Sequence, residues 1–222
     1  GTWQDIEMIG RDFDLVFDFM VNHISRQSIF FRDYLKKGSD SKYADMFLPF
    51  SKLSPTGEIS EKDLAKVYTR KPRPPYTVIE RPDGSREKIW CTFHDEQIDL
   101  DVYSPVTEQM LRSSLIRLAR TNAKMIRMDA IAYATYRLGT NCFFLEPDIW
   151  ELLERLKEYV VPFDAVMLPE VHEHYKYHMK LAERGYWTYD FALPMYNIYG
   201  QPPTLCCMEF RRLQAEWPGR WW

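Results

Sequence analysis

The stretch KMIRMDAIAYA, residues 124–134, places one arginine and one aspartate in an otherwise apolar run of strand length. Arg127 and Asp129 are two residues apart, so on a strand their side chains point to the same face. A carboxylate is costly to bury unless an opposite charge accompanies it, and Arg127 can supply that charge and keep Asp129 ionised. The stretch therefore predicts a strand that carries a charged pair for chemistry.

Helix and strand patterns alternate on both sides of this stretch. Residues 1–13 form a short amphipathic helix pattern, with Thr2 as a candidate N-cap. The apolar run at 14–23 is typical of a strand buried on both faces, and helical spacing at 28–38 stops at Gly38. Further helix patterns lie at 107–122, 147–160 and 175–185, and further strand patterns at 124–133, 164–172 and 186–194. This alternation predicts parallel βα units.

Residues 39–98 interrupt the alternation. They are polar and rich in proline and turn signals, and the runs at 76–80 and 87–93 flank RPDGSR as a hairpin would. We expect a small irregular insertion here.

Composition excludes several classes of function. The net charge is −3 with no long run of one sign, which gives no reason to propose nucleic acid as a partner. No signal peptide or membrane-length apolar run is visible, so we expect no membrane partner. The four cysteines show no CxxC spacing, which argues against a zinc site or disulfide framework and favours the cytoplasm. The sequence indicates no cofactor, and it leaves the oligomeric state open.

Two architectures satisfy the alternation: a doubly wound sheet and a TIM barrel. No Gly-rich phosphate loop follows any predicted strand, which weakens the dinucleotide-binding version. Polar residues follow three successive strands, and the C-terminal rim is where barrels place their active sites. The pattern favours the α/β barrel.

The polar residues at these strand ends suit glycosidic bond chemistry. An ionised carboxylate such as Asp129 attacks the anomeric carbon, while a protonated one donates to the leaving oxygen and later acts as base. Glu170 follows the apolar run 166–169, and apolar surroundings would raise its pKa and suit the acid role.

Several motifs carry a family resemblance. DFMVNH (18–23), QIDLD (97–101), IRMDAIAY (126–133) and LPEVH (168–172) resemble motifs of the alpha-amylase superfamily of glycoside hydrolases, family 13. Longer stretches, including 22–48, GTNCFF (139–144), EVHEHY (170–175) and YDFALP (189–194), are similar to the sucrose phosphorylase group. The resemblance runs from Gly1 to about Met195.

The resemblance implies a partial (β/α)8 TIM barrel containing about strands three to six, with a domain B insertion after the third strand. The implied units are a barrel part with helix, strand three and helix (1–38), a domain B-like insertion (39–98), a barrel part with strands four to six (99–195) and an atypical tail (196–222).

The resemblance also implies roles for the strand-end residues. Asp129 matches the nucleophile, Glu170 the general acid/base, and Arg127 the arginine that orients the nucleophile. Asp18 and His23 match residues that hold the glucose hydroxyls.

Tyr133 and His172 match positions associated with phosphate or acceptor binding, and Arg70, Lys71 or Arg73 of the basic loop could contact an anion. The implied reaction is retaining glucosyl transfer from sucrose or a related alpha-glucoside to inorganic phosphate.

Two alternatives stay open: an alpha-glucosidase or amylase-type hydrolase, and a non-catalytic truncated remnant. No His-Asp pair follows residue 190 to supply the third carboxylate of the family. We therefore expect little or no turnover from this chain alone. The donor sugar is also open among sucrose, sucrose phosphate, glucosylglycerol and glucosylglycerate.

Overall fold

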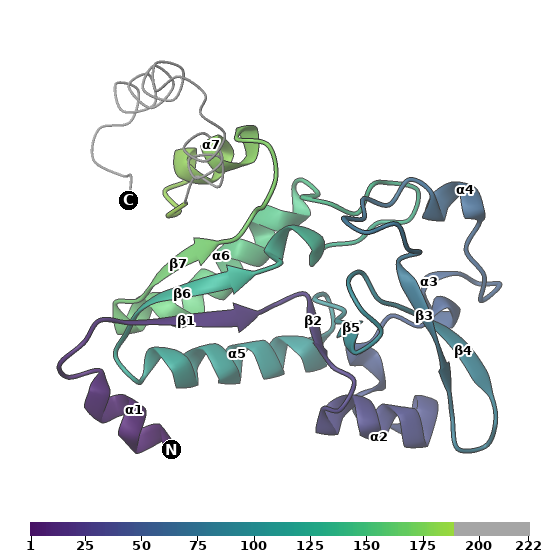
Figure 1. The fold of residues 1–222 in the computed structure, drawn as a ribbon, viewed down its shortest axis with the longest axis horizontal. Coiled ribbons are helices and arrows are strands. Elements are labelled where there is room, and N and C mark those ends of the chain that lie inside the picture. The colour runs from purple at the N-terminus through teal and green to yellow at the C-terminus, as the bar shows by residue number, and fades with distance from the viewer. Residues whose placement is uncertain (189–222) are drawn as a thin grey trace.

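The centre of the molecule is a parallel sheet of three strands, in the order β1-β6-β7 (Figure 1). We describe residues 1–188 of a computed structural model. The strands are β1 (Leu15–Met20), β6 (Ala123–Asp129) and β7 (Val166–Pro169). The first two are neighbours in the sheet although about a hundred residues separate them in sequence, as expected when an insertion and a helix lie between two parallel strands.

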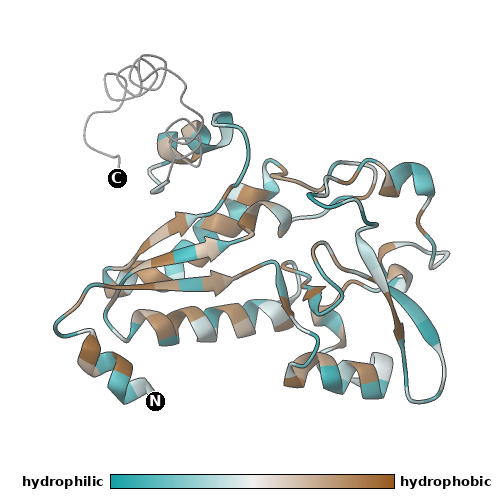
Figure 2. Ribbon diagram, viewed as in Figure 1, coloured by the Kyte–Doolittle hydropathy of each residue, from teal (hydrophilic) through white to brown (hydrophobic). Residues whose placement is uncertain are grey.

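Two long helices pack on the same face of this sheet. They are α5 (Pro105–Ala119), which Ser104 caps, and α6 (Asp148–Val160), and each contacts both the other helix and a strand. Figure 2 shows hydrophobic residues concentrated along the strands and on these helices. The shared core contains Leu111, Leu115, Ile126, Met128 and Leu153, all buried. The predicted βα alternation is confirmed here.

The opposite face of the sheet is open on β1, so the prediction that this strand is buried on both faces is wrong. Its exposure alternates, and Val16 and Met20 are 60% and 41% exposed. The reason is that α5 and α6 cover only one face, where Phe17 and Phe19 pack against the core.

The shorter helices begin and end where sequence signals predicted. Thr2 caps α1 (Trp3–Ile9) in a capping box with Asp5. The helix α2 (Ile29–Lys37) ends at Gly38, whose φ of 61° lies in the region that favours glycine. The helix α7 (Lys176–Glu183) follows β7.

The insertion lies beyond the C-terminal ends of the three strands (Figure 1). The predicted hairpin is present as β3 (Tyr76–Glu80) and β4 (Arg86–Trp90). A second antiparallel pair joins β2 (His23–Ser25) to β5 (Gln97–Asp99), and so ties the insertion back to the end of β1. The remaining elements are α3 (Phe50–Leu53), α4 (Glu61–Leu64) and the 3-10 helices η1 (Gly38–Asp40), η2 (Ala44–Met46), η3 (Ile131–Tyr133) and η4 (Val161–Phe163).

The insertion has a hydrophobic core of its own. Phe47, Ile79 and Ile89 are fully buried there, together with Phe31 and Tyr34 from α2. The packing of α2 thus joins it to the insertion, whereas the predicted boundary at residue 38 places it with the barrel; the domain limits stay predictions.

Two predicted segments reach past the described residues. The strand expected at 186–194 lies mostly outside them, and the tail at 196–222 lies wholly outside. Within residues 1–188, no helix has the length and apolar character that a membrane span requires.

Candidate active site

One guanidinium, that of Arg127 on β6, binds three carboxylates at the C-terminal end of the sheet. Its Nη1 lies 2.6 Å from Asp18 Oδ1 and 2.8 Å from Asp129 Oδ1, and its Nη2 lies 2.8 Å from Glu170 Oε1. Strand register explains the arrangement, since Asp18 on β1 pairs with Arg127 and Met20 pairs with Asp129. Four charged groups from two strands and the loop after β7 therefore converge on one face.

Glu170 is the most buried acid of this cluster, with 16% of its side chain exposed. Burial is the largest cause that raises the pKa of Glu170, and a hydrogen bond to Asp129 together with that residue's negative charge raises it further. The Ala130 N–H and the charge of Arg127 oppose the increase without cancelling it. The direction of the predicted shift is confirmed, and its causes are burial and the neighbouring carboxylate of Asp129.

The backbone around Ala130 positions the acid. Ala130 has a φ of 54°, in the left-handed region that an L-residue seldom adopts, and its N–H donates to Glu170 Oε2 at 3.2 Å. The Glu170 N–H in turn donates to the Met128 carbonyl at 3.0 Å. Both ends of Glu170 are thus fixed to the strand that carries Asp129. Sequence reasoning missed this contact, because a left-handed alanine has no sequence signature.

His23 lies at the start of β2 and is 6% exposed. Its Nε2 lies 2.9 Å from Gln97 Nε2, its Nδ1 lies 3.4 Å from Asn22 Nδ2, and its ring packs edge-on against Phe93. Burial lowers the pKa of His23 to about 4, against the opposing charge of Asp129. The imidazole is therefore neutral near pH 7, and it lies close enough to Asp129 to feel its charge.

Tyr133 lies in η3, directly after the strand that bears Asp129, inside an aromatic cluster. Its ring centroid is 4.8 Å from Phe93, 4.9 Å from Phe143 and 6.0 Å from a stacked Tyr68. The Tyr133 hydroxyl is buried without a hydrogen-bond partner in the described structure. Such an unpaired donor costs about 1–3 kcal/mol, which a ligand atom could recover.

Arg70 lies within electrostatic reach of both Tyr133 and His172, since its charge acts on the pKa of each. Partial desolvation and then the positive charge of Arg70 lower the pKa of the exposed His172. Arg73, by contrast, is committed to the insertion, since it donates to the Phe93 carbonyl at 3.1 Å and pairs with Asp95 at 2.6 Å. Of these two arginines, Arg70 is the one whose charge acts on the site.

The structure thus brings Asp18, Arg127, Asp129 and Glu170 into one cluster and sets His23 beside it. Tyr133 and His172 lie on the adjoining side, towards the insertion, and both feel the charge of Arg70. Within residues 1–188, no group of His, Cys, Asp and Glu side chains is arranged to hold a metal ion.

The chain is similar to several known phosphorylases. The chain is 45% identical to a sucrose phosphorylase of Streptococcus mutans and 41% identical to a sucrose 6(F)-phosphate phosphorylase of Thermoanaerobacterium thermosaccharolyticum, each over 90% of its length. The crystal structure of sucrose 6F-phosphate phosphorylase from Thermoanaerobacter thermosaccharolyticum superposes on 90% of the chain with a TM-score of 0.84.

The chain belongs to the sucrose phosphorylase-like group of the alpha-amylase superfamily.

The chain covers less than half the length of these relatives. The chain spans 41% and 42% of the two curated relatives, and no protein-family model matches it. Another relative, 39% identical, is a glucosylglycerol phosphorylase of Marinobacter adhaerens, so the group contains several donor sugars. The trehalulose synthase MutB, at 18% identity and a TM-score of 0.68, shares the fold.

Proposed function

We propose that this chain carries the catalytic carboxylates of a retaining glycoside phosphorylase, which transfers a glucosyl group from sucrose or a related alpha-glucoside to inorganic phosphate. The observation that carries the proposal is the single guanidinium of Arg127 shared by Asp18, Asp129 and Glu170. The spacing of the two carboxylates supports a retaining mechanism. Asp129 Oδ1 and Glu170 Oε1 each lie 2.8 Å from a terminal nitrogen of the same guanidinium, an arrangement that suits the close pair of a retaining enzyme better than the separation of about 6.5–9.5 Å in an inverting pair.

The proposed first step is attack of Asp129 on the anomeric carbon. The glycosidic bond breaks as the glucosyl–Asp129 ester forms, and the proton of Glu170 passes to the leaving oxygen. Arg127 orients Asp129, and Asp18 and His23 bind the sugar hydroxyls. A neutral His23 suits that task, because one of its ring nitrogens can donate a hydrogen bond and the other can accept one.

The proposed second step is attack of phosphate on this ester, with Glu170 now taking the proton. Phosphate must bind here in preference to water, and a dianion needs charged or hydroxyl donors. The unpaired hydroxyl of Tyr133, the imidazole of His172 and the guanidinium of Arg70 offer such donors on one side of the cluster.

The proposal extends to the architecture. We infer that β1, β6 and β7 correspond to strands three, four and five of a (β/α)8 barrel, as their parallel order and the helices on one face support. We also place the reaction in the cytoplasm, which the free, buried thiols of Cys91 and Cys142 support.

The test is a radiolabelled transfer assay with and without phosphate. Because the sequence offers no third carboxylate motif, we expect slow turnover and therefore long incubations. Labelled glucose 1-phosphate should form only when phosphate is present, and Asp129→Asn should abolish it. Free glucose as the sole product would identify a hydrolase. The absence of product with every donor would favour the alternative of a non-catalytic chain. Running sucrose, sucrose 6-phosphate, glucosylglycerol and glucosylglycerate in parallel identifies the donor.

A further inference from the structure

One side-chain hydrogen bond joins the insertion to the loop that carries Glu170. The Tyr68 hydroxyl, from the loop at 66–75, donates to Glu173 Oε2, three residues after the acid. The Tyr68 N–H also donates to the Asn141 carbonyl at 2.8 Å. Tyr68 is therefore held at both ends, by its backbone and by its hydroxyl.

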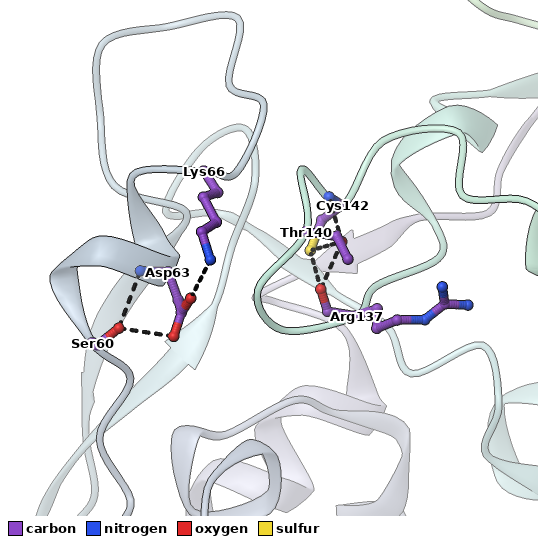
Figure 3. Close-up of polar contacts among 6 residues, drawn as sticks. All are labelled: Ser60, Asp63, Lys66, Arg137, Thr140 and Cys142. Carbon is purple, nitrogen blue, oxygen red and sulfur yellow. Dashed lines mark hydrogen bonds and ion pairs between the residues drawn. The ribbon is translucent and has the colours of Figure 1, made fainter.

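The segment that accepts the hydrogen bond from the Tyr68 N–H is held by local hydrogen bonds of its own. In the loop 137–142, the Thr140 hydroxyl and the Cys142 thiol both donate to the Arg137 carbonyl, and Thr140 Oγ1 accepts from the Cys142 N–H (Figure 3). On the facing side, Ser60 caps α4, which leads into the loop at 66–75. These local bonds give Tyr68 a fixed support.

The ring of Tyr68 packs on the side of the Arg127 carboxylate cluster where the proposed function places phosphate, which we call the acceptor side. It stacks on Tyr133 at 6.0 Å and contacts Phe143 at 4.7 Å. The hydroxyl of Tyr133 is buried in this contact region and unpaired in the described structure. A movement of Tyr68 would therefore change what Tyr133 can bind.

Arg70 follows Tyr68 by two residues, so a fixed Tyr68 limits where the backbone of Arg70 can lie. Arg70 makes no ion pair with the residues that the structure describes. Its charge adds to the desolvation that lowers the pKa of His172, and it opposes the rise in the pKa of Tyr68 and of Tyr133. The pKa of Tyr68 is raised on balance, chiefly by its hydrogen bond to Glu173, and the same bond is the largest cause that lowers the pKa of Glu173.

We propose that Tyr68 and Glu173 are positioning residues whose hydrogen bond fixes the loop 66–75 against the loop after β7, and thereby holds Arg70 beside His172. The proposed reaction assigns no chemical step to either residue. Calling this the acceptor side rests on the proposed function, whereas the positioning itself is a property of the fold that can be tested without turnover.

The first experiment is hydrogen–deuterium exchange of the whole chain, comparing wild type with Tyr68→Phe, Glu173→Ala and the double variant. Tyr68→Phe keeps the ring stacking and removes only the donor. Losing a hydrogen bond to a charged group should accelerate exchange in peptides from 66–75 by about ten- to a hundredfold. The double variant should exchange no faster than either single variant, and Glu173→Gln, which retains an acceptor oxygen, should restore part of the protection.

A matched control joins α6 to the residues that follow α7. Tyr186 donates to Glu154 Oε1 at 2.6 Å, which is another tyrosine–glutamate bond, and Tyr186→Phe should leave exchange at 66–75 unchanged. Unchanged exchange in Tyr68→Phe would overturn the proposal, as would equal acceleration of the loop by Tyr186→Phe.

The second experiment follows the charge of Arg70 by NMR titration of His172. Tyr68→Phe should raise the pKa of His172, because Arg70 is released, and Arg70→Gln should raise it as well. The combined variant should show no more than the effect of Arg70→Gln alone. A faster-exchanging loop with an unmoved His172 titration would mean that the bond is merely structural, and would also overturn the proposal.

Kinetics separate this proposal from the proposed function. Where wild type forms glucose 1-phosphate, Tyr68→Phe should raise KM for inorganic phosphate about tenfold or more and leave KM for the sugar donor nearly unchanged. A wild type without phosphate-dependent product contradicts the proposed function, while the exchange and the titration still decide the positioning role.

Discussion

Replacing Arg127 by methionine tests the charge cluster most directly. Methionine has a similar length and no charge, so the change removes the charge with little change in volume. Asp129 and Glu170 expose 23% and 16% of their side chains, so they would be left as poorly solvated like charges. Asp18 is 67% exposed, and its ion pair is worth little in water.

The magnitude follows from these exposures. Breaking a fully buried ion pair by removing one partner costs about 3–5 kcal/mol, and the residual solvation of Asp129 and Glu170 reduces that figure. We expect the free energy of unfolding at pH 7 to fall by about 2–4 kcal/mol. Urea unfolding followed by circular dichroism measures it.

The pH dependence sharpens the test. Without Arg127, the pKa of Glu170 should rise further, because the positive charge that opposes the increase is gone and only the Ala130 N–H still opposes it. The folded variant then binds a proton that the unfolded chain has not yet taken up, so its stability should rise as the pH falls from 7 towards 5. The deficit relative to wild type should therefore shrink on acidification.

The exposed ion pair between Arg86 and Glu80 provides the control. These side chains are 72% and 57% exposed, so Arg86→Met should cost less than about 1 kcal/mol. Equal losses in Arg127→Met and Arg86→Met, or a deficit independent of pH, would refute the view that Arg127 stabilises a partly buried carboxylate cluster.

Two further predictions concern single residues. The pKa of His23 falls from 6.5 to about 4 on folding, so the unfolded chain binds its proton first and stability is lost between these pH values, by about 3 kcal/mol at the acid end. His23→Gln should flatten that part of the urea-derived stability profile, and an unaltered profile would contradict the assignment. Gly10→Ala should lower the free energy of unfolding by about 1–3 kcal/mol, because a Cβ there would lie 2.5 Å from the Thr121 carbonyl oxygen. A melting temperature equal to that of wild type would contradict this prediction and show that the backbone shifts to make room for the Cβ.

The regular elements could be predicted from sequence because their causes are local. Thr2 begins one helix and Gly38 ends another through hydrogen bonds and backbone angles within a few residues, and Leu111 and Leu115 repeat at helical spacing. The burial of β1 could not be predicted in this way. Its apolar composition is real, but whether a second layer covers Val16 and Met20 depends on segments that do not neighbour it in sequence.

The amino-acid sequence by itself determined the strand ends that bear Asp129 and Glu170, the shared face of Arg127 and Asp129, and the apolar run that precedes the acid. Only the tertiary structure decided that Asp18 reaches the same guanidinium, that the N–H of Ala130 holds Glu170, and that Tyr68 meets Glu173 across 105 positions of chain. The physical reason is the distance along the chain over which each kind of interaction acts. Periodicity and capping act over a few residues, whereas a hydrogen bond between distant loops forms only after the sheet and the insertion have set their separation.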